Sequence, residues 1–107
     1  MLRSVDSGEV SGTAIECPLE RATLTLDVTD RELRAPIART ADAWLAFGFD
    51  RDLDAAADEA IETMLDLMEV ELGIPRPEAR ALASVSVDLH VTQVVNEVKG
   101  VHAILRP

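Results

Sequence analysis

The sequence is poor in aromatic residues and cysteine. Of its 107 residues 48% are hydrophobic but only 3% are aromatic, and none is tyrosine, so the core must be aliphatic and no phenol is available as an acid or oxyanion donor. The one cysteine, Cys17, excludes an internal disulfide and the cysteine-rich zinc modules. Because no base lies near it in the sequence, we interpret Cys17 as a small buried hydrophobe rather than a nucleophile.

Basic residues and long apolar runs are also scarce. Twenty acidic residues against ten lysines and arginines give a net charge of −10, and Lys99 is the single lysine. Such a charge repels polyanions, so nucleic acids and anionic membranes are not expected as partners. No apolar run approaches the roughly 20 residues that span a bilayer, and residues 1–6 lack the apolar segment of a signal peptide. We therefore expect a cytoplasmic protein.

Four stretches in the first half of the chain have β-strand patterns. Residues 9–17 predict a strand, and residues 23–29 alternate so regularly that they predict the clearest strand of the chain. Residues 35–40 predict an edge strand, because Pro36 cannot donate a hydrogen bond to a sheet. Residues 44–49 predict a fourth strand. In the second stretch the inward positions are Leu24, Leu26 and Val28. In the fourth, one face carries Leu45, Phe47 and Phe49, and the other carries Trp44, Ala46 and Gly48.

After residue 50 the apolar period changes from two to 3.6 residues, which predicts a hairpin of two helices. Asp50 and Asp52 are candidate N-caps of the first helix, and Gly73 is its expected C′ residue. The second helix is predicted to begin with Pro77 and to end near Val87. The apolar stripe of the first helix consists of Ala57, Ile61, Met64, Leu65, Met68 and Leu72.

Residues 89–95 and 101–105 predict a closing β-hairpin. Pairing Val95 with Val101 places the apolar residues of both strands on one face of the sheet. The resulting order, ββββααββ, has no βαβ rhythm. We therefore predict a single α+β domain over residues 1–107, with a mixed or antiparallel sheet backed by a two-helix hairpin.

The two histidines are the first candidates for metal ligands or bases. In the pairing above, His102 lies opposite Val94 and thus about 13 Å along the sheet from His90. Two groups so far apart cannot both bind one metal ion at about 2 Å. We interpret them as structural or surface histidines, with a role as ligand or base as the alternative.

The stretch from Ser7 to Pro18 combines glycines with an acidic residue, Glu9. A glycine beside a carboxylate lets the backbone approach a ligand while the carboxylate points at it. Together with later motifs, this stretch resembles the acetamidase/formamidase family in an ordered series that runs from Ser7 to Leu105. The later motifs are Glu16-Cys17-Pro18-Leu19-Glu20-Arg21, Phe47-Gly48-Phe49-Asp50, Val91-Thr92-Gln93-Val94-Val95-Asn96 and Val98-Lys99-Gly100-Val101-His102.

The resemblance implies a metal-dependent hydrolase that converts simple linear amides to ammonia and a carboxylate. It implies Glu9 as a catalytic residue, Gly8 as a substrate-binding residue, and a divalent metal cofactor, zinc before other metals. The family's Gly-Asp-Gly-Glu turn is altered here, since Asp6 and Ser7 stand before Gly8, and Ser7 is a poor metal ligand. We therefore assign no metal ligand in this chain.

Two functions remain open at this point. In the first, the chain corresponds to the C-terminal portion of an amidohydrolase, is incomplete and inactive alone, and acts with a companion N-terminal chain on a small amide. In the second, it is a non-catalytic α+β module that forms a homo-oligomer to cover an exposed apolar face. Whether the chain is an enzyme by itself does not follow from the sequence.

Overall fold

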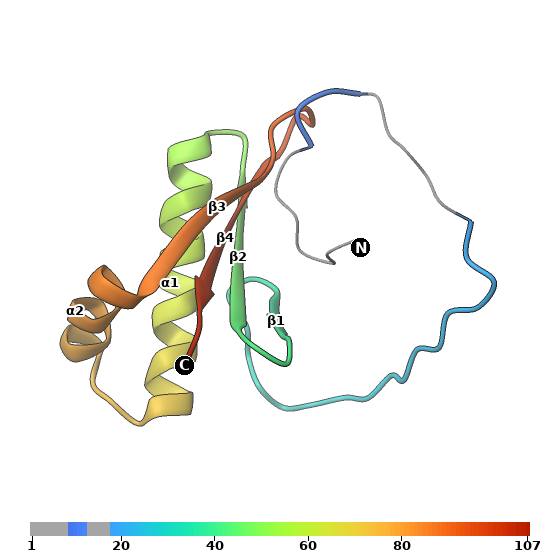
Figure 1. The fold of residues 1–107 in the computed structure, drawn as a ribbon. Helices are drawn as coiled ribbons and strands as arrows, with labels where there is room; N and C mark the ends of the chain where they lie inside the picture. The colour runs from blue at the N-terminus through green and yellow to red at the C-terminus, as the bar shows by residue number, and fades with distance from the viewer. Residues whose placement is uncertain (1–8, 13–17) are drawn as a thin grey trace.

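The computed structural model describes residues 9–12 and 18–107. The strands form one antiparallel sheet in the order β1-β2-β4-β3, and both helices lie on one side of it (Figure 1). The α+β class, with a sheet backed by two helices, is confirmed. In the described part of the chain, no helix combines the length and apolarity that crossing a membrane would require. The elements are β1 (Ile37–Arg39), β2 (Trp44–Asp50), α1 (Leu53–Leu72), α2 (Arg76–Ser86), β3 (Val87–Gln93) and β4 (Lys99–Leu105).

Helix α1 begins and ends where the sequence predicted. The side chain of Asp52 accepts a hydrogen bond from the backbone N–H of Asp54 at 3.0 Å. Gly73 adopts the left-handed conformation with φ 64°, and its N–H donates to the carbonyl of Glu69. The buried stripe is rotated from the predicted one and consists of Ala56, Ala60, Thr63, Met64, Leu65, Leu67 and Met68.

Helix α1 crosses the sheet in close contact at Gly48. A Cβ atom added there would lie 2.1 Å from the carbonyl oxygen of Ala56 and 2.4 Å from the amide nitrogen of Ala60. The alternation predicted for β2 therefore places its glycine and alanine toward the helix. The core between helix and sheet includes Ala46, Met64, Leu65, Met68, Val101, Ala103 and Leu105.

Arginines join α2 to α1. Arg76, the first residue of α2, forms ion pairs with Glu62, with Asp66 at 2.5 Å and with Glu69 at 2.8 Å. Helix α2 thus begins one residue before the predicted Pro77. The acidic side chains of α1 that face α2 are neutralised by these contacts rather than left to solvent alone.

The same contacts change the acidity of two carboxyl groups. Hydrogen bonds from Arg80 and Arg76 lower the pKa of Glu62. Burial alone would raise the pKa of Asp66, but hydrogen bonds from Arg76 and Arg34 outweigh burial and lower it. Both groups therefore stay ionised further into the acid range than free carboxyls do.

Residues 18–30 run as an open loop away from the helices (Figure 1), and Arg31 and Arg34 then contact α1 through ion pairs with Glu71 and Asp66. The strand predicted at residues 23–29 is wrong, because none of these residues pairs in the sheet. Its inward positions Leu24, Leu26 and Val28 are instead 84%, 91% and 92% exposed. An alternating apolar pattern favours a strand only where a neighbouring strand forms hydrogen bonds with it. No strand among the described residues pairs with residues 23–29.

The pairing of β3 with β4 differs from the predicted register by four residues. Val91 lies opposite Val101, and His90 lies opposite His102, whereas the sequence predicted Val95 opposite Val101. An irregularity follows Val91 in β3, and the connecting loop lies at residues 94–98 rather than at the predicted residues 96–100. Because the shift is an even number of residues, each strand still presents the predicted face to the helices.

Candidate functional site

Glu9 lies at the end of the β3–β4 hairpin. Its backbone forms an isolated parallel bridge with Gln93, and its carbonyl oxygen accepts the N–H groups of Val94 at 3.0 Å and Val95 at 3.2 Å. Its side-chain Oε2 accepts a hydrogen bond from the Nδ2 of Asn96 at 3.4 Å. Two motifs separated by 87 residues in the sequence are therefore brought together.

The other predictions for the sequence around Glu9 concern residues outside the described ones. These are Gly8, the predicted substrate-binding residue, together with Cys17 and most of the strand expected at residues 9–17. Asn96, which the structure places beside Glu9, was noted in the sequence only as part of a motif. Its role could not be found from the sequence, because it depends on how the hairpin loop folds.

The loop that carries Asn96 is held by two side chains from its flanking strands. The Nζ of Lys99 donates to the carbonyl oxygens of Val94 at 2.6 Å and Asn96 at 2.9 Å. The Nε2 of Gln93 donates to the carbonyl oxygen of Val98 at 2.8 Å. The single lysine of the chain thus satisfies loop carbonyls that no strand pairs with, and it fixes the loop against which Glu9 rests.

The two histidines lie together on the sheet face opposite the helices, and the predicted separation of about 13 Å is wrong. The rings of His90 and His102 stack with centroids 5.5 Å apart and planes 23° apart. Phe47 of β2 lies on the other side of His102 at 5.7 Å. The four-residue change of register explains the difference, since it moves His102 from opposite Val94 to opposite His90.

His102 is fully buried in the centre of the sheet. The Oγ1 of Thr92 lies 2.7 Å from its Nδ1, while its Nε2 has no hydrogen-bond partner among the described residues. Burial lowers the pKa of His102, and repulsion from a positive charge on His90 lowers it further. His102 is therefore neutral at pH 7, and its Nε2 is a buried polar atom of the kind that costs stability wherever it stays without a partner.

These residues do not fit the metal that the resemblance implies. No group of three His, Cys, Asp or Glu side chains in residues 9–12 and 18–107 could hold a metal ion. Stacked imidazoles direct their lone pairs in nearly parallel planes, so His90 and His102 do not converge on one ion. Glu9 approaches neither ring, because Gln93 is three residues from His90, about 10 Å along the strand. We derive no step through a metal from this chain.

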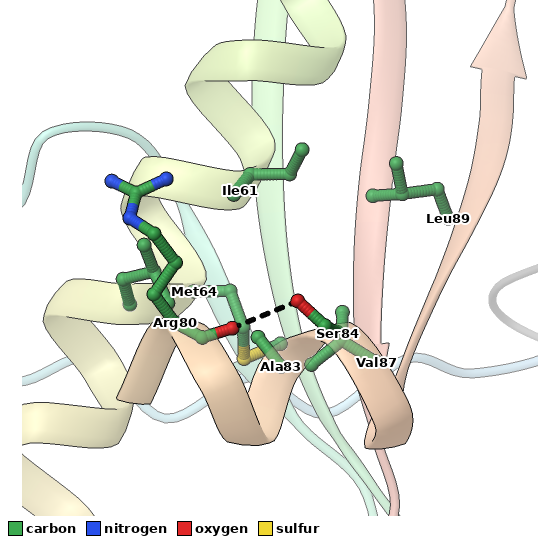
Figure 2. Close-up of a pocket in the computed structure, with 8 residues that line it drawn as sticks. Ile61, Met64, Arg80, Ala83, Ser84, Val87 and Leu89 are labelled. Atoms are coloured by element: carbon green, nitrogen blue, oxygen red, sulfur yellow. Dashed lines mark hydrogen bonds between the residues drawn. The ribbon is translucent and has the colours of Figure 1, made fainter. Parts of the chain in front are cut away.

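A groove opens on the opposite side of the sheet, between the two helices and the outer strand β3. Its volume is about 300 Å³, and Figure 2 shows Ile61 of α1 and Leu89 of β3 on its facing walls. A hydrogen bond from the hydroxyl of Ser84 to the carbonyl of Arg80 keeps one polar side chain of α2 turned along its own helix. The lining is Ile61, Met64, Leu65, Arg80, Ala83, Ser84, Val87 and Leu89.

The fold of this chain occurs in solved acetamidase structures. The crystal structure of an acetamidase from Bacillus halodurans matches 66% of this chain and 24% of that chain, with a TM-score of 0.62 and 30% identity. An acetamidase from Yersinia enterocolitica matches 64% of this chain and 21% of its own, with a TM-score of 0.61 and 20% identity. A predicted acetamidase/formamidase from Thermoanaerobacter tengcongensis matches 74% of this chain and 26% of its own, with a TM-score of 0.67 and 22% identity.

This chain spans about a quarter of the length of these proteins. No family model and no curated protein sequence matches it. The matches at 20% and 22% identity show a similar fold only. The match at 30% identity shows similarity in sequence as well as in fold. The resemblance to the acetamidase/formamidase family that the sequence motifs indicated is therefore confirmed, over about two thirds of this chain and about a quarter of the Bacillus halodurans protein.

Proposed function

We propose that this chain forms one part of an amidohydrolase of the acetamidase/formamidase type, and that its catalytic groups are completed by a companion chain. The observation that supports the proposal is the likeness to the Bacillus halodurans acetamidase at 30% identity over 66% of this chain. Because only 24% of that protein is matched, the reaction of the whole enzyme is carried over as a proposal. The proposed substrates are simple linear amides.

In this proposal Glu9 provides the proton transfer that amide hydrolysis requires. Water adds to the amide carbon, and the carboxylate of Glu9 takes a proton from it and delivers that proton to the leaving nitrogen as the C–N bond breaks. The products are a carboxylate and ammonium. The hydrogen bond from Asn96 to Oε2 is the support for an oriented Glu9 carboxylate. The groups that stabilise the oxyanion, and any divalent metal such as zinc, belong to the companion.

The first test measures ammonia release from formamide and acetamide by the purified chain, with and without added Zn²⁺. We expect no release by the chain alone. We expect release when it is combined with a chain that carries the remaining three quarters of an acetamidase fold. Release by the isolated chain would contradict the proposed incompleteness, and absence of both complex and release in the combination would contradict the proposed role.

Two variants test the residue assignment in the combined system. Glu9→Gln keeps the shape of the side chain and its contact with Asn96 but removes the base, so ammonia release should fall at least about 100-fold. Glu97→Gln is the matched control, because its carboxylate lies in the same loop as Asn96 and, among the described residues, forms an ion pair with Arg51 at the surface. Equal activity of Glu9→Gln and Glu97→Gln would refute the role of Glu9.

One observation favours a second function, that of a self-associating module without catalysis. The apolar side chains of residues 23–29 are almost entirely exposed in the isolated chain. An apolar strand pattern without a partner is typical of a surface that another chain covers. The two functions are compatible, since an assembly surface can serve an enzyme part as well as a non-catalytic module.

A further inference from the structure

Residues 18–29, which we name the arm, have the pattern of a strand without a sheet. Leu24, Leu26 and Val28 alternate with polar residues, and the three apolar side chains are 84% to 92% exposed. The chain is correspondingly open, with a radius of gyration of 15.0 Å, against about 13 Å for a compact domain of this length. The arm thus has apolar side chains at the alternating positions that a strand buries, but its residues are not paired in the sheet.

The same molecule has a sheet edge that lacks a strand. β3 is the outer strand of the sheet, and within the described residues only the isolated bridge at Gln93 pairs with its free side. Leu89 and Val91 on this strand are 47% and 38% exposed. An edge with free N–H and C=O groups and exposed apolar side chains is a template for one more strand.

The apolar groove lies directly beside that edge. Its walls come from α1, α2 and β3 itself, with Ile61 and Leu89 facing each other across it (Figure 2). A strand added outside β3 would direct alternate side chains toward the helices and into this groove. The spacing of three apolar residues in the arm, at every second position, is the spacing that such a strand needs.

We propose that two copies of this chain exchange arms, each adding residues 23–29 as a strand to the β3 edge of the other. Leu24, Leu26 and Val28 then cover the groove of the second copy. Because arm and acceptor are on the same chain, the contact is made twice around a two-fold axis and closes as a dimer.

The arm is fixed at its root and long enough to reach a neighbour. Ion pairs from Arg31 to Glu71 at 3.3 Å and from Arg34 to Asp66 at 3.0 Å hold the root on α1. The twelve residues from 18 to 29 extend over about 40 Å when straight. Its seven-residue segment 23–29 is as long as the seven-residue strand β3 beside which it would lie.

The net charge gives the association a distinctive salt dependence. Each copy has a charge of −10, so two copies repel at low ionic strength, while the exchanged strands are held by apolar contacts and backbone hydrogen bonds. Raising NaCl from about 0.05 M to about 0.5 M shortens the screening length to a few ångströms. The dimer should therefore become tighter with added salt, whereas a dimer held by surface ion pairs would become weaker.

Sedimentation equilibrium of the full chain, over a wide concentration range, tests the proposal with two variants of the arm. Leu26→Asp should weaken the dimer at least tenfold, because the aspartate would enter the apolar groove. Thr25→Asp is the matched control and should leave the dimer unchanged, because its side chain points to the other face. Both positions are exposed in the isolated chain, so circular dichroism should find both monomers folded.

A second pair tests the acceptor side. Leu89→Asp, in the groove wall, should weaken the dimer like Leu26→Asp, whereas Val85→Asp on the exposed side of α2 should not. A chain that stays monomeric at every concentration overturns the proposal. The arm would then be covered by a different protein chain. A dimer that survives both Leu26→Asp and Leu89→Asp also overturns it. Neither readout involves ammonia release, so this proposal and the amidase proposal can fail independently.

Discussion

Gly48 is the position where a single methyl group should damage the fold most. In Gly48→Ala, the added Cβ would lie 2.1 Å from the carbonyl oxygen of Ala56, where ordinary contact begins at 3.4 Å. The atoms that it meets belong to the backbone of α1, so no side chain can rotate away. The helix must move about 1.3 Å from the sheet, which is the difference between these two distances.

That displacement separates the helix from the centre of the core. The contacts of Met64, Leu65 and Met68 with the sheet all lie along the same helix, and a radial gap of about 1 Å already forfeits up to half of a dispersion contact. Overpacking of a tight core costs about 1–3 kcal/mol, and more when backbone must move. We expect Gly48→Ala to lower the free energy of unfolding by about 3 kcal/mol or more, a large part of the total for a domain of this size.

Urea unfolding followed by circular dichroism measures this loss, with Gly12→Ala as the control. Apart from its chain neighbours, no described residue has an atom within 4 Å of a Cβ built on Gly12, so that variant should stay within about 0.5 kcal/mol of the parent chain. A Gly48→Ala variant as stable as Gly12→Ala would refute the close approach of α1 to β2. It would also refute the placement of the core described above.

Three further perturbations test the electrostatics and the helix cap. Arg76→Met should lower the free energy of unfolding by about 1 kcal/mol at pH 7. Because folding lowers the pKa values of Glu62 and Asp66, the free energy of unfolding of the parent chain should decrease as pH falls below about 5. In urea titrations at each pH, the variant should show a smaller decrease. Asp52→Ala should cost about 1 kcal/mol in the same assay through loss of the cap, and Asp52→Asn far less. Burial lowers the pKa of His102, so on acidification this histidine is protonated at a higher pH in the unfolded chain than in the folded one. The free energy of unfolding should therefore decrease as pH falls below about 6.5. In proton NMR, the His102 ring resonances of the folded chain should titrate at a lower pH than those of a histidine in an unfolded peptide.

The helices could be predicted from sequence because their signals are local. Asp52 caps α1 with its own side chain, Gly73 ends it with its own backbone, and both interactions span only a few residues. The fold class followed from the same local patterns. The strand predicted at residues 23–29 shows the limit of this reasoning. A strand needs a partner, and a partner is a property of the fold or of a second chain, not of the segment.

The error in the hairpin register shows what an alternating sequence pattern leaves open. An alternating pattern determines which side chains share a face, and it is satisfied equally by any register that differs by an even number of residues. The true register depends on a loop that Gln93 and Lys99 hold through side-chain hydrogen bonds to backbone carbonyls. A shift of four residues keeps every face, yet it pairs His90 with His102. Asn96 lies in the loop in either register, and its contact with Glu9 joins residues 87 positions apart, which no local pattern encodes. The core can therefore be predicted from a pattern with period two, whereas the site depends on contacts that this pattern does not encode.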